Sequence, residues 1–220
     1  MSFSFAHVEG DTSNTFAELV SRFNRTGKPL QVDFRKLVSW VPLGDQLTHH
    51  LHSYPAKLLP HIGHFFVRAQ CLRGTRPIIL DPFCGSGTVA LEASIANVQP
   101  YIADSNPLAL LISRVKTTGY DLADLSAAIE RALSRSRRYK TGPVVQLVNS
   151  QLWYLPEIKR SLERILRSVN EEPNDRTRDF LRVCFSATAR RLSNADPAIS
   201  VPVRSRTKET FSDARNGTCQ

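Results

Sequence analysis

One stretch of the chain constrains its fold more than any other: a short apolar run that leads directly into a glycine loop. Residues 77–80 read Pro-Ile-Ile-Leu and continue into the segment Asp81-Pro82-Phe83-Cys84-Gly85-Ser86-Gly87-Thr88. A short apolar run bounded by turn residues is typical of a buried parallel strand. The apolar residues that follow the loop from Val89 predict a helix that ends around Asn97. We therefore predict a strand, a loop and a helix in direct succession.

The same order is repeated immediately downstream. Residues 101–103 predict a second strand that is closed by Asp104, and Asn106-Pro107 opens another helix that extends to Val115. Strand, glycine loop, helix, strand and acid form the order expected of a nucleotide-type crossover unit. We predict an α/β fold, doubly wound around a parallel sheet.

The glycine spacing indicates what kind of ligand the loop can accept. Gly85 and Gly87 have no side chain in the way of a ligand, and the free amides at the helix start favour negative charge. A phosphate-binding P-loop carries Lys after its second glycine, where this chain has Thr88. The third glycine of a dinucleotide-binding loop is also missing, because Leu91 stands there. A ligand without a pyrophosphate is favoured.

Two carboxylates flank the loop. Asp104 lies at a strand end about twenty residues after the loop, where a carboxylate can accept hydrogen bonds from both ribose hydroxyls. Asp81 is placed to meet a cationic or amide-bearing part of the ligand. A ribose joined to an ammonium-bearing amino acid describes S-adenosylmethionine. The alternative is that Asp81 caps the following turn and Asp104 caps the helix begun at Pro107, and capping can coexist with binding.

These residues resemble a known family, the DNA amino-methyltransferases that act on cytosine N4 or adenine N6. The loop resembles their methionine-binding motif, and residues 52–58, His-Ser-Tyr-Pro-Ala-Lys-Leu, resemble the block that precedes it. The resemblance implies a Rossmann-like S-adenosylmethionine-dependent methyltransferase fold, double-stranded DNA as partner and S-adenosyl-L-methionine as cofactor. The cofactor-binding residues that it implies are Tyr54, Pro55, Ala56, Lys57, Asp81, Pro82, Phe83, Cys84, Gly85, Ser86, Gly87, Thr88, Asp104, Asn106 and Pro107.

The chain departs from this family where the target base should bind. The family holds the base with a Ser/Asp/Asn-Pro-Pro-aromatic motif, since the exocyclic amino group is a poor nucleophile and the flipped base needs polar acceptors and a stacking ring. No Pro-Pro pair occurs in this sequence. We therefore assign no catalytic residue and expect an incomplete fold that binds the cofactor without transferring a methyl group unaided. The catalytic motif is then on a second polypeptide, or the gene is truncated.

Two other functions remain open from the sequence. The first is a non-catalytic subunit, or a degenerate remnant, that binds cofactor and nucleic acid without turnover. The second is an RNA guanine methyltransferase, because those enzymes share the glycine loop.

The charge of the chain favours a polyanionic partner. The formal net charge is +9, and its greater part lies in residues 121–220. Neutralised phosphates release counterions and supply most non-specific affinity for nucleic acid. We predict DNA contacts from Arg190 and Arg191, with Arg137 and Arg138 next, because a planar guanidinium suits phosphate. Solvated helix faces are the alternative reading of these arginines.

Residue patterns along the chain predict its organisation. We expect an N-terminal helical or irregular segment over 1–47, the cofactor-binding core over 48–120, an Arg-rich helical insertion over 121–192 and a polar tail over 193–220. The helices expected outside the crossover unit cover residues 15–23, 52–67, 122–139, 156–169 and 178–192, with Pro55 in a first turn and Pro60 limiting where its helix begins.

Cysteine usage and hydropathy predict the compartment. The four cysteines, Cys71, Cys84, Cys184 and Cys219, have no zinc or disulfide spacing, so we expect small buried side chains in a reducing compartment and no metal. No run of about 18 apolar residues and no signal-peptide pattern is present. We expect a cytoplasmic protein without a membrane anchor.

Overall fold

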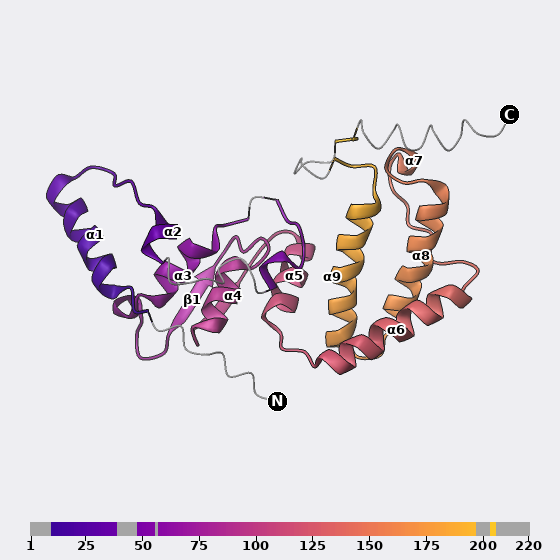
Figure 1. Ribbon diagram of the computed structural model, residues 1–220, viewed down its shortest axis with the longest axis horizontal. Helices are drawn as coiled ribbons and strands as arrows, with labels where there is room; N and C mark the ends of the chain where they lie inside the picture. Colours follow the sequence, from indigo (N-terminus) through magenta and orange to yellow (C-terminus); the bar gives the residue numbers. More distant parts are fainter. Residues whose placement is uncertain (1–9, 39–47, 56, 197–202, 206–220) are drawn as a thin grey trace. The chain divides into compact units, whose positions relative to one another are not determined.

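The computed structural model describes residues 10–38, 48–55, 57–196 and 203–205. Contacts divide the chain into two compact units (Figure 1). The sheet unit comprises Met1–His50 and Ala56–Thr117, and the helical unit comprises Leu51–Pro55 and Thr118–Gln220.

The sheet unit is built around one crossover. Strand β1 (Ile78–Asp81) is followed by helix α4 (Thr88–Ile95), strand β2 (Gln99–Ile102) and helix α5 (Pro107–Thr117). The strands are parallel, with Ile78 opposite Gln99 and Leu80 opposite Tyr101, and they form a two-stranded sheet in the described part of the chain. The predicted order of strand, loop, helix and strand is confirmed, as is the α/β class.

One face of this sheet is covered by helices. Helix α3 (Pro60–Arg68) packs against α4, and both lie beside the sheet (Figure 1). Gly63 lies at this contact, where a Cβ would be in ordinary van der Waals contact with Glu92 at 3.5 Å. The core between helices and sheet consists of Val67, Ala93, Ala96 and Val98, with Ile79 packed against it from β1. Burial of these apolar side chains holds the unit together.

The opposite face of the sheet exposes apolar side chains. Ile78 is 60% exposed, Leu80 66% and Tyr101 56%. Strand register places Leu80 and Tyr101 side by side on this face. Parallel sheets are ordinarily covered on both faces, so the described residues leave an apolar surface that a parallel sheet would normally bury. Our expectation of a buried strand is therefore wrong for Ile78 and Leu80, and on the other face Ile79 is half-buried.

An aromatic cluster joins the N-terminal helices to α3. Helix α1 (Ser13–Thr26) confirms the helix predicted over residues 15–23. It is capped by Gly27, whose φ of +60° is the left-handed conformation that glycine adopts readily. Helix α2 (Phe34–Leu37) places Phe34 against Phe65 and Phe66, with ring centroids 5.3 and 5.8 Å apart. The 3₁₀ turns η1 (Thr48–His50) and η2 (Gln70–Leu72) also belong to this unit.

The helix predicted over residues 52–67 is shorter than expected. It begins only at Pro60, which lacks an N–H and fits the first helical turn. Leu59, the residue before this proline, has an extended ψ of 122°, because the proline ring disfavours helical conformation there. Placing Pro55 in a helical turn was therefore wrong: in the structure it precedes the helix in non-helical chain.

The helical unit consists of packed helices with an apolar seam. Its helices are α6 (Leu122–Arg138), α7 (Ser150–Trp153), α8 (Pro156–Asn170) and α9 (Asp175–Leu192), which confirm the three long helices predicted here. Figure 1 shows α8 and α9 side by side with α6 crossing one end of both. The seam contains Ala128, Ala132, Val169 and Leu181, flanked by Ile165 and Phe180.

A buried carboxylate also ties these helices together. Glu172 is only 2% exposed, and its two oxygens lie 3.3 Å from Arg131 and 3.4 Å from Arg135 of α6. Two guanidinium groups offset the cost of burying the charge. Part of the arginine excess in this unit therefore has a structural role.

The cysteines differ in their surroundings. Cys84 is buried and Cys184 is half-buried, whereas Cys71 is exposed in the turn η2, so the expectation of burial was wrong for Cys71. Cys219 lies outside the described residues. Within the described ranges, no helix is both long enough and apolar enough to cross a membrane.

Candidate cofactor-binding site

The glycine loop closes at the carboxyl ends of the two strands. Gly85 and Gly87 have φ values of +48° and +74°, in the left-handed region that favours glycine. The Cys84 amide donates to the Ala103 carbonyl at 3.0 Å, and the Gly87 amide donates to the Cys84 carbonyl at 2.7 Å. The loop is thereby fixed between β1, the chain that leaves β2 and the start of α4.

Asp104 is hydrogen-bonded to the loop. Its Oδ2 accepts from the Gly85 amide at 2.9 Å, and its Oδ1 accepts from the Asn106 amide at 2.8 Å. Asp81 makes a similar local bond, in which Oδ1 accepts from the Phe83 amide at 3.2 Å. Asp81 therefore binds the turn that follows it, whereas Asp104 binds both the glycine loop and the turn that follows it. Each carboxylate oxygen has two lone pairs, so these bonds leave capacity for ribose hydroxyls or an ammonium group.

A serine of α5 supports the loop from behind. Ser113 is fully buried, and its Oγ donates to the Gly85 carbonyl at 3.2 Å. The same oxygen lies 3.6 Å from Cys84 Sγ. A Cβ at Gly87 would lie 2.7 Å from the Cβ of Ser113 and 2.8 Å from its Cα. The second glycine is thus required by the approach of α5 as well as by its backbone conformation. Sequence reasoning missed Ser113, whose only signal was a small polar residue among apolar ones in a helix.

The remaining loop side chains divide into buried and exposed groups. The hydroxyls of Ser86 and Thr88 are buried and lack a hydrogen-bond partner among the described residues. Burial raises the pKa of the Cys84 thiol, which is therefore a poor nucleophile. In contrast, the Phe83 ring is 88% exposed. The loop thus carries the Asp104 carboxylate at its edge and the exposed side chain of Phe83.

A buried carboxylate follows the loop on α4, and sequence reasoning missed it. Glu92 is 4% exposed, and its oxygens lie 2.9 Å from His49 Nε2 and 3.0 Å from His64 Nδ1. Burial by itself raises the pKa of Glu92, but the hydrogen bonds from both histidines hold it below its ordinary value. Among the described residues, no group of three or more His, Cys, Asp or Glu side chains could hold a metal ion.

The block upstream of the loop is divided between the two units. Tyr54 and Pro55 belong to the helical unit, while Lys57 belongs to the sheet unit, where its Nζ donates to the His49 carbonyl at 3.3 Å. Ala56 lies outside the described residues. The assignment of this block to the cofactor's neighbourhood stays a prediction.

Lys116 is a buried cation at the end of α5. It is 2% exposed, its Nζ has no hydrogen-bond partner in the described ranges, and burial together with the charge of Lys57 lowers its pKa to about 8. Replacing a buried unpaired charge with an apolar group of similar shape is often stabilising. We expect Lys116→Met to raise the free energy of unfolding by about 1–2 kcal/mol at pH 7, as measured by urea denaturation.

The pH dependence of the gain in stability distinguishes removal of a buried charge from improved packing in Lys116→Met. A Lys pKa that is lower in the folded state destabilises that state below pH 8, and the penalty disappears as the pH rises toward the ordinary value of 10.5. The advantage of Lys116→Met should therefore shrink across this range. Lys116→Arg keeps the charge and should show no gain. A pH-independent gain, or none at pH 7, would contradict the explanation.

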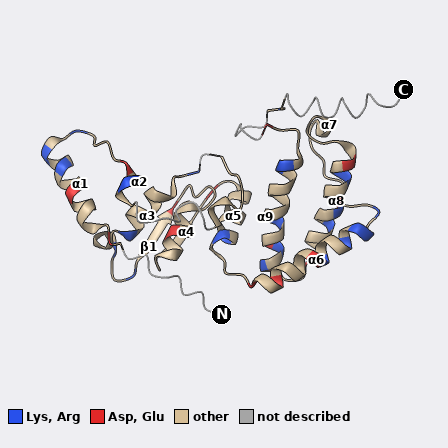
Figure 2. Cartoon of the chain, in the orientation of Figure 1, with Lys and Arg blue, Asp and Glu red and all other residues tan. Residues whose placement is uncertain are grey.

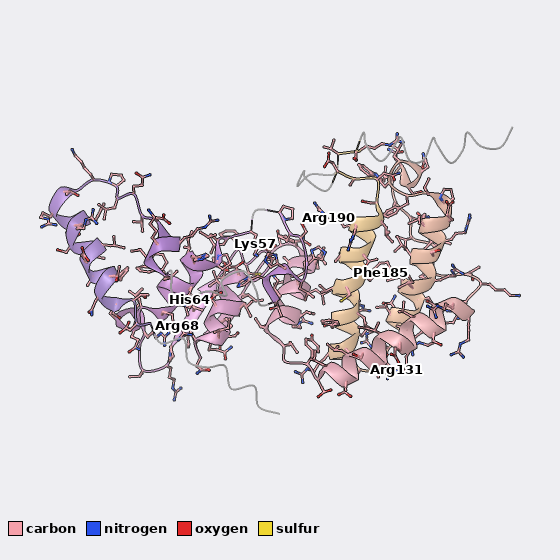
Figure 3. All side chains as sticks on the ribbon, viewed as in Figure 1. Lys57, His64, Arg68, Arg131, Phe185 and Arg190 are labelled. Atoms are coloured by element: carbon pink, nitrogen blue, oxygen red, sulfur yellow. The ribbon has the colours of Figure 1, made fainter. Side chains whose placement is uncertain are left out.

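The arginines predicted to contact DNA lie at two different ends of the helical unit. Arg137 and Arg138 are exposed at the end of α6. Arg190 is half-buried and Arg191 exposed in the last turn of α9, and Figure 3 shows Arg190 at the end of α9 away from α6. Lys and Arg residues occur along α6, α8 and α9 (Figure 2). Nothing in the geometry joins the two pairs into one site, so their role stays a prediction.

Comparison with known proteins places the chain in a family. The family described as "RMKL-like, methyltransferase domain" matches residues 49–168, which is more than half of the chain. The chain belongs to this methyltransferase family, and the family resemblance stated from the sequence is confirmed. The match includes the upstream block, the glycine loop, Asp104 and the helices α6 and α7.

Curated relatives agree with this assignment. The Type II methyltransferase M.MvaI of Kocuria varians is 31% identical over 159 residues, which are 68% of this chain and 35% of the relative. The Type II methyltransferase M.MjaII of Methanocaldococcus jannaschii is 29% identical over 91 residues, 41% of this chain and 17% of the relative. The chain thus spans a minor part of the length of either relative. No solved structure matches it.

Proposed function

We propose that the chain is the S-adenosylmethionine-binding part of a DNA methyltransferase that acts on an exocyclic amino group of cytosine or adenine. The observation that carries this proposal is the glycine loop, whose Gly85 amide is held by Asp104 at 2.9 Å while Gly87 rests against Ser113. Family membership supports methyl transfer, and the relatives of Type II support DNA as the substrate.

Each residue of the loop has a role in this proposal. S-adenosylmethionine supplies a methyl group on a positively charged sulfur. The backbone of Gly85 and Gly87 faces its amino-acid part, and Asp81 receives the ammonium group. Asp104 accepts the ribose hydroxyls, while Asn106 and Pro107 line the side of the ribose and adenine. All of these residues belong to the sheet unit.

The catalytic motif is supplied from elsewhere in this proposal. The printed sequence contains no Pro-Pro-aromatic motif. The exposed apolar face formed by Ile78, Leu80 and Tyr101 supports a missing neighbour, since parallel sheets ordinarily have both faces covered. We propose that the segment or subunit carrying the motif covers this face and completes a Rossmann-like sheet.

Two assays test the proposal on the full chain. Calorimetry should detect S-adenosylmethionine binding and no binding of ATP or NAD, because the loop lacks the features of pyrophosphate sites. Labelled methyl groups should not enter duplex DNA with this chain alone, and they should enter once a polypeptide with a Pro-Pro-aromatic motif is added. Absence of cofactor binding would contradict the first part, and unaided transfer to DNA would contradict the second.

A non-catalytic binding subunit is the second candidate, and the missing motif is the observation that favours it. Such a subunit would bind cofactor and DNA yet stay inactive with any complementing polypeptide. Methyl transfer to guanine in RNA in place of DNA would identify the third candidate. The same labelled-methyl assay, run with both nucleic acids, distinguishes the three.

A further inference from the structure

The strongest feature outside the glycine loop is the buried junction at Glu92. Its carboxylate receives one hydrogen bond from each of two elements that lie well before α4 in the sequence, from His49 of η1 and from His64 of α3. All three side chains are at most 5% exposed. One carboxylate on the helix that follows the cofactor loop therefore holds two other segments.

The unpartnered nitrogens of the two imidazoles indicate how each ring presents a proton to Glu92. His49 Nδ1 and His64 Nε2 are buried and have no partner in the described part of the chain. A bare ring nitrogen tolerates this better than an N–H, which would be a buried donor without an acceptor. An N–H on His49 Nε2 and on His64 Nδ1 therefore places one donor of each ring toward Glu92. The carboxylate needs both donors because it is buried with its charge.

The junction is linked to the cofactor loop and to the upstream block. Glu92 lies one turn after Thr88, where α4 leaves the glycine loop. On the other side, the backbone carbonyl of His49 accepts a hydrogen bond from Lys57 at 3.3 Å. The path from loop to Lys57 thus runs through α4, Glu92 and His49.

We infer that Glu92 is a positioning residue for the cofactor site: through His49 it holds η1 and Lys57 in register with the glycine loop. His64 has a different task. It belongs to α3, which the apolar core of Val67, Ala93 and Val98 already holds on α4. Loss of either histidine should weaken the fold to a similar degree, but only loss of His49 should release η1 and Lys57, the part of the upstream block that the family resemblance places beside the cofactor. This inference depends on the proposed function.

His49→Ala and His64→Ala form a matched pair for the test. Both remove one buried donor from Glu92, so both should lower the melting temperature by comparable amounts. We expect His49→Ala to weaken S-adenosylmethionine binding about tenfold, whereas His64→Ala should change it by less than about threefold. His49→Gln carries an amide donor that reaches the position of Nε2 and should restore most of the affinity.

The outcomes are distinct. If the wild-type chain binds no S-adenosylmethionine, the proposed function fails before Glu92 is tested. If the wild type binds and both alanine variants, folded by circular dichroism, lose affinity equally or not at all, the positioning role of the His49 branch is wrong. Failure of His49→Gln to recover affinity would likewise overturn it. If His49→Ala does not fold, His49→Gln and His49→Asn, which differ in reach, provide the comparison.

Discussion

Replacing Gly87 with alanine should destabilise the sheet unit by about 3 kcal/mol or more and abolish cofactor binding. Two effects add at this position. A residue with a side chain is strained at a φ of +74°, and the new Cβ would lie 2.8 Å from the Cα of Ser113, where no side-chain rotation can relieve the clash. The loop or α5 must therefore move, and the Gly85 carbonyl loses its bond to Ser113 Oγ.

Urea denaturation and calorimetry with S-adenosylmethionine measure the two effects of Gly87→Ala separately. Gly74→Ala is the matched control, because a Cβ there meets nothing within 4 Å and the backbone has no positive φ. Ser113→Gly in the Gly87→Ala background should recover part of the stability by removing the clashing side chain. Unchanged stability and affinity in Gly87→Ala would show that the loop does not rest on α5 as described.

Replacing Gly142 with alanine should have an effect of similar size on the helical unit, about 3 kcal/mol. A Cβ at Gly142 would lie 2.6 Å from the backbone nitrogen of Arg164 and even closer to the carbonyl of Glu163, so it would clash with the backbone of α8. The chain after Gly142 runs along this helix, where the Val145 amide donates to Glu163 Oε1 at 3.0 Å. The substitution forces this segment away from α8.

Gly119→Ala is the control within the same unit, since its Cβ would enter open space. Hydrogen exchange localises the damage: amides of α8 should lose protection in Gly142→Ala, while those of β1 and α4 should keep theirs. Equal loss of protection in both units, or none in α8, would contradict this expectation.

Much of the sheet unit was predictable because its signals are local. The apolar run before Asp81, the two glycines and the acid after the second strand each depend on a few neighbouring residues, and the structure shows the strands and helices where they were expected. The start of α3 at Pro60 was only partly predictable. A proline fits the first turn of a helix but not its interior, so Pro60 signals a possible start. The apolar residues upstream of Pro60 nevertheless have helical spacing, although the chain there is not helical.

The supporting residues were not predictable for a physical reason. Ser113 and Glu92 act through contacts between segments distant in the sequence, such as the hydrogen bond between Glu92 and His49, 43 positions apart. No periodicity records such pairing. For the arginines, the sequence shows the charge but not the partner. Arg131 and Arg135 are paired with the buried Glu172, which lies on another segment of the chain.

A crystal of this chain soaked with S-adenosylhomocysteine, the demethylated form of the cofactor, tests the central claim most directly. We predict ribose hydroxyls within hydrogen-bonding distance of the Asp104 carboxylate and the amino-acid end against the backbone of Gly85 and Gly87. Density for the compound away from this loop, or no density at saturating concentration, would contradict the assignment.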